Sequence, residues 1–285
     1  MTGNAVLSTN IFLDTLVQDF VHYAEKTEMC RAIILTGSAA RTVRPADKYS
    51  DRDIQLFVTD PDGDQYLAWL RKYAPLWMVI RERQAKTNLW LIMYHGGHSL
   101  HLSINTVADL EKIVERQQLW TDQQRGYKIL LDRDGYVAKL PPPRSPSYQP
   151  PSETAFVECV ESFFYGVILI AKQLKRGHLW TVQWANCIEQ KFLLQMLEWH
   201  AHAHADVDTW YRGEAMKHWV TDDIWTSLHE VFGHFDSADS WRALFAAIAL
   251  FRRTADETAT ILNYVLPKAT MAGIVSYVEQ LQRDG

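Results

Sequence analysis

The sequence predicts an α+β protein, in which an N-terminal domain with a mixed β-sheet flanked by helices is followed by a C-terminal α-helical bundle. Three observations predict this fold class. Short β-branched and apolar runs separated by turn residues occur before residue 141, apolar residues spaced three and four apart dominate after residue 151, and six of the ten prolines fall within residues 141–151. Proline fits neither a helix interior nor a central strand, so this last segment is an extended connector. We expect the domain boundary there, with one domain at residues 1–145 and the other at residues 146–285.

The first domain mixes helix and strand patterns. A stripe of apolar residues near the N-terminus predicts a helix that begins with a cap at Ser8, Thr9 or Asn10. Alternating or β-branched runs predict strands, and Gly96-Gly97 predicts a hairpin turn between two of them. The predicted strands are residues 31–35, 53–59, 90–94, 99–105 and 128–131, with a further helix at residues 65–73.

The second domain carries helical spacing throughout. Ser152 and Glu153 open a long helix, and Asp239 or Ser240 is expected to cap a later one. Further helical patterns lie at residues 192–199, 241–251 and 254–264.

The composition is that of a soluble globular protein. The 285 residues are 47% hydrophobic and 22% charged, which excludes disorder, and the net charge of −5 excludes a basic nucleic-acid-binding module. The N-terminus lacks the pattern of a signal peptide, and no apolar run approaches the about 18 residues of a membrane span. Cys30, Cys159 and Cys187 lack C-x-x-C spacing, which is typical of a reducing compartment. We therefore predict a cytoplasmic protein with neither a membrane nor a nucleic-acid partner.

Residues 36–58 hold the most informative chemical pattern. Gly37 and Ser38 follow one predicted strand in a turn, and Asp51 and Asp53 begin the next. Because strand side chains alternate, both carboxylates point to the same side of the sheet, where they repel each other unless a cation lies between them. Mg²⁺ is such a cation, and it completes its shell with phosphates and water. Since the backbone N–H groups of a glycine turn can hold a phosphate, the pattern predicts metal-assisted nucleotidyl transfer rather than a solvated turn.

The G-S turn followed at this distance by D-x-D resembles the nucleotidyltransferase superfamily that includes polymerase β. Further motifs, in the expected order, resemble the aminoglycoside 6-adenylyltransferase (streptomycin adenylyltransferase) family. They span about residues 30 to 265 and comprise Leu130-Leu131-Asp132-Arg133-Asp134-Gly135, the A-K-x-L-x-R run at residues 171–176, Met196-Leu197-Glu198-Trp199 and Leu250-Phe251-Arg252-Arg253-Thr254-Ala255. The resemblance implies an N-terminal nucleotidyltransferase domain and a helical substrate-binding domain, in agreement with the division at the prolines.

The resemblance also implies an activity, the transfer of AMP from Mg-ATP to a hydroxyl of an aminoglycoside such as streptomycin, as in antibiotic resistance. It implies that Asp51 and Asp53 bind Mg²⁺ and that Gly37 and Ser38 hold the triphosphate of ATP.

Two basic residues complete the nucleotide site that the resemblance implies. Family members often have an arginine directly after G-S, where this chain has Ala39, and Arg41 is expected to take its place. Lys172, from the helical domain, is expected to reach a phosphate, and the alternative is a lysine on the helix surface.

One predicted strand departs from the family. Where the family has a third carboxylate in a pattern like R-I-D-L-T-I, this chain has S-L-H-L-S-I, with His101 at the position of the aspartate. Imidazole is a poor Mg²⁺ ligand but a natural general base, so His101 is expected to deprotonate the acceptor hydroxyl. The alternatives are a degenerate nucleotide-binding relative with weak or no turnover, and an adenylyltransferase that acts on a different small molecule or on a protein.

The acidic charge is concentrated in the helical half. Residues 1–150 carry 18 basic and 17 acidic residues, net +1, whereas residues 151–285 carry 11 and 17, net −6. An acidic domain suits a cationic acceptor. The candidate acceptor-binding residues are Glu158, Glu161 and Glu198, with Trp184 or Trp199 to stack on a sugar ring; the alternatives are solvated helix faces and core packing.

A histidine tract, His200, His202 and His204, lies after these residues. On a helix only His200 and His204 share a face, and we interpret the tract as a solvated helix end rather than a metal site. The oligomeric state is not predicted.

Overall fold

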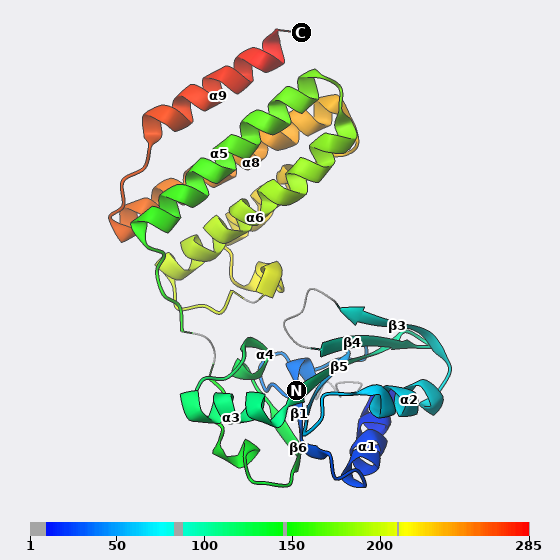
Figure 1. The fold of residues 1–285 in the computed structure, drawn as a ribbon. Helices are drawn as coiled ribbons and strands as arrows, with labels where there is room; N and C mark the ends of the chain where they lie inside the picture. The colour runs from blue at the N-terminus through cyan, green and yellow to red at the C-terminus, as the bar shows by residue number, and fades with distance from the viewer. Residues whose placement is uncertain (1–9, 83–87, 145–146, 210, 285) are drawn as a thin grey trace, which may run out of the picture. The chain divides into compact units, whose positions relative to one another are not determined.

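The structure is a computed structural model that describes residues 10–82, 88–144, 147–209 and 211–284. The chain divides into two compact units, Met1–Pro146 and Ser147–Gly285. The predicted boundary between residues 145 and 146 lies outside the described residues, as do Ser8 and Thr9. The α+β class is confirmed, because the first unit holds a mixed sheet with flanking helices and the described elements of the second are helical (Figure 1).

The first unit follows the predicted order of elements, with additions. Its elements are α1 (Ile11–Glu25), β1 (Cys30–Thr36), the 3-10 turn η1 (Gly37–Ala39), β2 (Arg52–Val58), α2 (Asp64–Tyr73), β3 (Leu76–Glu82), β4 (Asn88–Tyr94), β5 (His98–Thr106), α3 (Val107–Arg116), α4 (Thr121–Gln124), β6 (Lys128–Asp132) and η2 (Val137–Lys139). Asn10 is the cap of α1, since its side chain accepts a hydrogen bond from the N–H of Leu13.

The described strands form one six-stranded sheet in the order β3-β4-β5-β2-β1-β6. β2 and β5 lie in the middle and are parallel, while their other neighbours are antiparallel. Alternation along β2 sends Leu56 into the core formed with α1 and α2, and Phe57 into the core formed with α3 on the opposite face. The sheet is thus covered on both faces, and its central strands present their N-terminal ends to the candidate site.

β3 and α3 are among the elements that were not predicted from the sequence. β3 is an edge strand whose residues are mostly exposed, so it lacks the apolar alternation that marks a half-buried strand. α3 follows β5 without a loop, and it begins with a capping box in which Thr106 and Asp109 exchange hydrogen bonds. The T-x-x-D spacing is a recognisable signal for the start of a helix, but it follows directly on the apolar run of β5 and was overlooked in the sequence.

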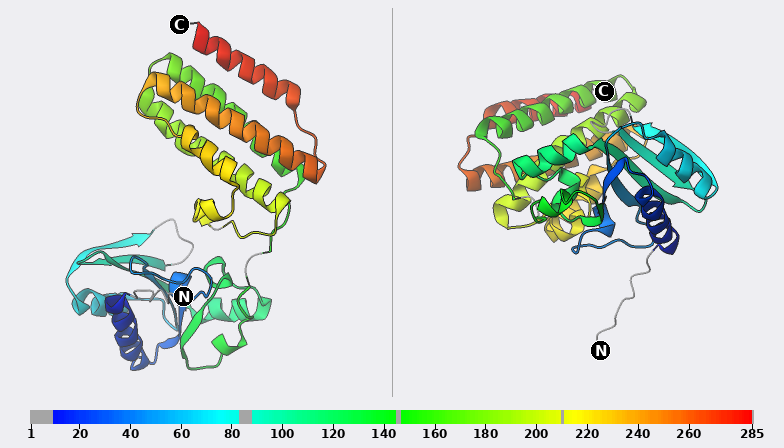
Figure 2. Two further views of the ribbon diagram at one scale, coloured as in Figure 1. Left: turned by 180° about the vertical axis from the view of Figure 1, so that it is seen from behind. Right: turned by 60° about the horizontal axis from the view of Figure 1, so that its bottom comes forward.

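The second unit is built from long helices. Its elements are α5 (Glu153–Lys175), α6 (Leu179–His204), the 3-10 turns η3 (Tyr211–Gly213) and η4 (Met216–His218), α7 (Asp222–Val231), α8 (Ser237–Leu262) and α9 (Lys268–Arg283). α5, α6 and α8 pack along one another, α7 packs on α8, and α9 packs on α5 (Figure 2). The patterns at residues 241–251 and 254–264 therefore belong largely to one continuous helix.

α5 is long and apolar enough to cross a membrane by length and composition alone. Its apolar stripe instead packs into the core of the second unit, where residues such as Phe163 and Phe164 are buried and Phe163 stacks on Phe251 at 3.8 Å between ring centroids. The predicted cap, Ser152, starts the helix by accepting a hydrogen bond from the N–H of Ala155 at 3.2 Å.

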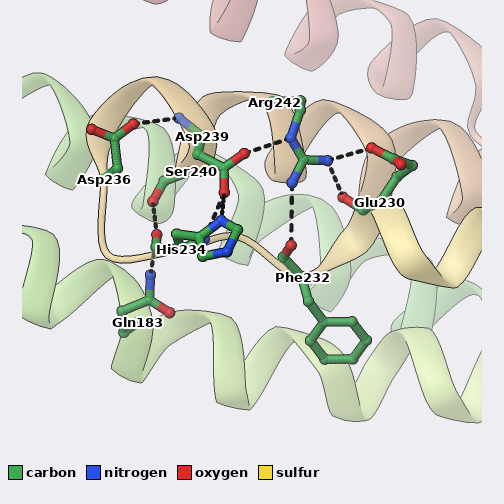
Figure 3. A network of polar contacts seen from close by, with 8 residues as sticks. All are labelled: Gln183, Glu230, Phe232, His234, Asp236, Asp239, Ser240 and Arg242. Carbon is green, nitrogen blue, oxygen red and sulfur yellow. Dashed lines mark hydrogen bonds and ion pairs between the residues drawn. The ribbon is translucent and has the colours of Figure 1, made fainter.

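The start of α8 corrects one expectation. Its cap is Asp236, whose carboxylate accepts the N–H of Asp239 at 2.8 Å, so the predicted caps Asp239 and Ser240 are wrong. Asp239 is instead held inside the first turn, where its carboxylate accepts hydrogen bonds from Arg242 and His234 (Figure 3). These bonds hold the pKa of Asp239 well below its usual range. The bonds to His234 hold the segment before α8 in place, and Asp236 rather than Asp239 caps the helix.

The core of the helical unit contains a buried carboxyl group, Glu189 of α6. Only 6% of the residue is exposed, and its Oε1 has no hydrogen-bond partner among the described residues. Gly166 of α5 makes room for it, because a Cβ there would lie 1.6 Å from Glu189 Oε2. Burial raises the pKa of Glu189 from 4.5 to about 8, so the carboxyl is protonated in the folded protein at neutral pH.

This carboxyl predicts a pH dependence of stability. Between pH 4.5 and about 8 the unfolded chain is ionised at Glu189 while the folded chain is not, so unfolding releases a proton and stability falls as pH rises. Glu189→Gln is expected to remove this component, on the order of 1 kcal/mol per pH unit, from the free energy of unfolding. Denaturant unfolding at pH 5, 6.5 and 8 measures it, with Glu158→Gln on the exposed side of α5 as the control. Parallel pH curves for wild type and Glu189→Gln would contradict the expectation.

Candidate active site

The predicted carboxylates and histidine converge at the N-terminal ends of the central strands. Asp51 precedes β2 directly and Asp53 is its second residue. In the parallel pairing of β2 with β5, Asp53 lies opposite His101, and in the antiparallel pairing with β1 it lies opposite Thr36. The buried neighbours Leu100 and Leu102 face the opposite side of β5, as expected. Alternation on both strands therefore places the polar side chains on one face.

The three side chains are in direct contact. His101 Nδ1 lies 2.9 Å from Asp53 Oδ1 and 3.4 Å from Asp51 Oδ2. One ligand atom from each of the three residues lies within 4.8 Å of the others. About a third of each side chain is exposed, with fractions of 38%, 31% and 28% for Asp51, Asp53 and His101. The cluster is thus assembled by the fold and open to solvent.

Charge repulsion acts between the two carboxylates of the cluster. Burial raises the pKa of Asp51, and the charge of Asp53 raises it further. Burial lowers the pKa of His101, but its hydrogen bond to Asp53 and the charges of both carboxylates outweigh this, and the pKa is raised overall. The imidazole therefore acts as a partial counter-ion for two carboxylates that would otherwise repel each other.

The G-S turn lies against Asp53. Gly37 has φ +66°, and a Cβ on it would lie 2.1 Å from Asp53 Oδ2, so only glycine allows this approach. The hydroxyls of Thr36 and Ser38 are buried and have no hydrogen-bond partner among the residues that the structure describes. Buried polar groups are normally paired, and these two therefore mark a place where a polar ligand belongs.

The donor set fits a magnesium ion at its two carboxylates. Hard cations take oxygen ligands, and Asp51 and Asp53 offer these on the same face of the sheet. His101 Nδ1 suits a transition metal better than Mg²⁺.

Arg41 follows the turn. Its N–H donates to the carbonyl of Gly37 at 3.3 Å and its Nε–H to the carbonyl of Arg44 at 2.7 Å. Arg41 thus stabilises the segment after the turn.

Three supporting residues were missed in the sequence. Arg52, 2% exposed, points away from the cluster and pairs with Asp14 of α1 at 2.7 Å, which anchors the start of β2. The alternation of D-R-D could have revealed it. Ser99 Oγ lies 3.3 Å from His101 Nε2. Lys128 Nζ donates to the carbonyl of Ala39 at 2.7 Å and brings a positive charge to the turn, and no pattern in the sequence indicates this.

The remaining predicted residues belong to the helical unit. Lys172 is exposed near the C-terminal end of α5, and Glu158 and Glu161 are exposed nearer its start. The structure does not bring all the predicted acceptor-binding residues to one place.

On α6, Trp184 is 66% exposed, whereas Glu198 and Trp199 are half-buried. Trp184 and Glu198 lie roughly 20 Å apart, given a rise of about 1.5 Å per residue. Trp199 packs near Phe156 of α5, with 5.9 Å between ring centroids. Burial raises the pKa of Glu198 to about 7.

Because the sequence pattern predicts a nucleotide at this turn, Gly37→Ala is expected to weaken nucleotide binding and to lower the rate of nucleotidyl transfer by about a hundredfold, the cost of misplacing catalytic groups by about 1 Å. The added Cβ must displace Asp53 or the turn, at a backbone conformation that alanine adopts poorly. Gly135→Ala is the matched control, because its φ is +68° and its Cβ would meet nothing within 4 Å. Equal ATP affinity in both variants, measured by titration calorimetry, would contradict the role of the turn.

The streptomycin adenylyltransferase family model matches residues 13–281, which run through both units and include the whole cluster. The chain belongs to the streptomycin adenylyltransferase family.

Relatives of this member of the streptomycin adenylyltransferase family cover nearly all of it. It is 27% identical to an aminoglycoside 6-adenylyltransferase of Campylobacter jejuni, over 88% of this chain and 90% of the relative. It is 25% identical to one of Bacillus subtilis (strain 168), over 91% of this chain and 94% of the relative. A crystal structure of an aminoglycoside 6-adenyltransferase from Bacillus subtilis matches with a TM-score of 0.46 and 20% identity, covering 94% of this chain and 97% of that chain.

Proposed function

We propose that this protein transfers AMP from Mg-ATP to a hydroxyl group of an aminoglycoside such as streptomycin. The observation that carries the proposal is the contact of Asp51, Asp53 and His101 beside the Gly37 turn, in a chain whose family match runs through both units. Two carboxylates, a glycine turn and unpartnered hydroxyls form a site for a metal-bound triphosphate rather than for a neutral ligand.

In this proposal the turn and the strand ends position the nucleotide. The backbone of Gly37 and the hydroxyl of Ser38 bind the triphosphate, and Arg41 adds positive charge to it. Asp51 and Asp53 would hold Mg²⁺, which when bound would neutralise charge on the phosphates and act as a Lewis acid. Arg52, fixed on Asp14, keeps the two carboxylates in register.

His101 accepts the proton of the acceptor hydroxyl. Asp53 holds Nδ1, so Nε2, beside the Ser99 hydroxyl, is the nitrogen that takes the proton. The acceptor oxygen then forms a bond to the α-phosphorus, the bond between the α-phosphorus and the bridging oxygen breaks, and pyrophosphate leaves. An orienting carboxylate on one imidazole nitrogen and a reacting group on the other is the arrangement that makes histidine an effective base.

The acidic helical unit binds the acceptor in this proposal, because an aminoglycoside is polycationic and residues 151–285 carry net −6. Glu158, Glu161 and Glu198 are the proposed acidic ligands, and Trp184 or Trp199 stacks on a sugar ring. We also place the enzyme in the cytoplasm, in keeping with its three unpaired cysteines.

Pyrophosphate release tests the proposal. With ATP, Mg²⁺ and streptomycin, we expect release that depends on the acceptor, together with a product heavier by one adenylyl group in mass spectrometry. A panel of other aminoglycosides defines the acceptor range. ATP binding without release on the whole panel would instead indicate a nucleotide-binding relative without turnover.

A further inference from the structure

A second cluster of metal-ligating side chains lies in the helical unit. His200 and His204 are one turn apart on α6, with 4.1 Å between their ring centroids. Glu257 of α8 reaches them, and its Oε2 lies 2.6 Å from His200 Nε2. One ligand atom from each of the three residues lies within 4.8 Å of the others. Residues 57 positions apart in the sequence are therefore brought to one point.

We propose that His200, His204 and Glu257 form a binding site for a zinc-class divalent transition metal. Two imidazoles and one carboxylate are a donor set that zinc favours, with ligand bonds of about 2.0–2.2 Å and a fourth position left for water. Mg²⁺ and Ca²⁺ take oxygen ligands instead and do not suit this set.

The histidine that lies at the helix end is already oriented for this role. His204 Nδ1 lies 2.8 Å from the backbone carbonyl of His200, to which its N–H donates. The lone pair of the neutral ring is then on Nε2, the atom available to a metal. Fixing the second ring nitrogen in this way is the usual means by which proteins orient a histidine ligand.

The surroundings allow an ion to enter and remain. His200 is buried, with 6% of its side chain exposed, while the side chain of Glu257 is 44% exposed, so the cluster is closed by protein on one side and reached by water on the other. Arg253, whose charge acts on His200, pairs with Asp223 at 2.8 Å, which offsets that charge. A bound metal would fasten the end of α6 to α8.

From the sequence alone, the histidine tract is interpreted as a solvated helix end, because the sequence cannot show that Glu257 of α8 lies beside His200. His202, between the two ligands in sequence, points elsewhere: its Nε2 contacts Thr209 Oγ1 at 3.1 Å, and its ring stacks on Tyr148 at 3.9 Å between centroids. It thus provides a matched control in the same tract.

Zinc titration of the full chain against a chromophoric chelator, with Mg²⁺ in excess, tests the site. We expect one equivalent to bind at this cluster in wild type, with a rise in melting temperature and, when Co²⁺ replaces zinc, the absorption of a four-coordinate ion. His204→Ala and Glu257→Gln change exposed groups and are expected to weaken zinc at least about a hundredfold, since losing even an outer partner of a ligand costs about 10–100-fold. His202→Ala is expected to bind zinc as wild type does.

The catalytic cluster could take a second equivalent, which Asp53→Ala identifies because it removes only that one. The site is overturned if His204→Ala and Glu257→Gln bind zinc as tightly as wild type, or if zinc raises their melting temperatures as much as it does that of His202→Ala. An equal loss of binding in His202→Ala would also overturn it, because that result would assign the metal to the exposed tract rather than to the pair of helices.

Discussion

Asp53→Ala is expected to lower the rate of adenylyl transfer by about a thousandfold or more, because the substitution removes a charge interaction worth several kcal/mol at about 1.4 kcal/mol per tenfold in rate. Asp53 is the central member of the cluster: it hydrogen-bonds His101 at 2.9 Å and lies against the Gly37 turn. In the proposed mechanism, its loss therefore disturbs the metal site, the general base and the phosphate-binding turn together. Pyrophosphate release with saturating ATP and acceptor measures the effect.

The control for this variant is Asp60→Ala. Asp60 is an exposed aspartate just beyond the other end of β2, and its carboxylate accepts a hydrogen bond from the backbone N–H of Asp62 at 3.1 Å. We expect it to keep wild-type activity and an unchanged melting temperature. If the double variant Asp51→Ala/Asp53→Ala kept its activity, the proposed mechanism would be wrong.

His101→Ala is expected to lower kcat by about 10²–10⁴-fold, the usual contribution of a general base, with a smaller effect on the affinity for ATP. The imidazole contacts both carboxylates, so its removal also leaves them without their partial counter-ion. Measuring kcat and ATP affinity separately distinguishes the loss of a base from the loss of the nucleotide site.

His101→Asp decides what this position does. If His101 is the base, aspartate is too weakly basic to replace it at neutral pH and turnover falls. A gain in turnover at high Mg²⁺ would show instead that the position calls for a third carboxylate ligand. The matched change His98→Asp lies on the same strand, where His98 stacks on Phe12 at 4.6 Å and takes no part in the cluster.

The clustering of the candidate active-site side chains was predictable, because alternation along a strand determines which face of the sheet each side chain occupies. To predict that Asp51, Asp53 and His101 lie together, it was enough to know that strand side chains alternate with a period of two and to assume that the two strands are neighbours. The pairing itself was not predictable, since nothing local in the sequence specifies that β2 and β5 are parallel partners. The contact between His101 and Asp53 depends on that pairing, whereas the contact between Gly37 and Asp53 depends on the antiparallel register of β1 with β2. Lys128 reaches the turn through the pairing of β1 with β6.

In the helical unit, spacing predicted the helices but not what they bring together. His200 and His204 share a face by periodicity alone, whereas Glu257 comes from another helix whose rotation depends on packing. The buried position of Glu189 was likewise hidden, because an acidic residue in a helical pattern normally marks a solvated face. Glu189 fits there because Gly166, on the neighbouring helix α5, has no side chain.

The parallel pairing of β2 with β5 has a consequence for the order in which the protein is synthesised. The strand carrying Asp53 leaves the ribosome before its partner, and His101 follows 48 residues later, after α2, β3 and β4. A parallel pair cannot close through a short turn, so the two central strands meet only after the intervening crossover exists. A nascent chain that stops before β5 therefore has both carboxylates but no imidazole to balance them. The site is completed late, by the same long-range contact that joins the two middle strands of the sheet.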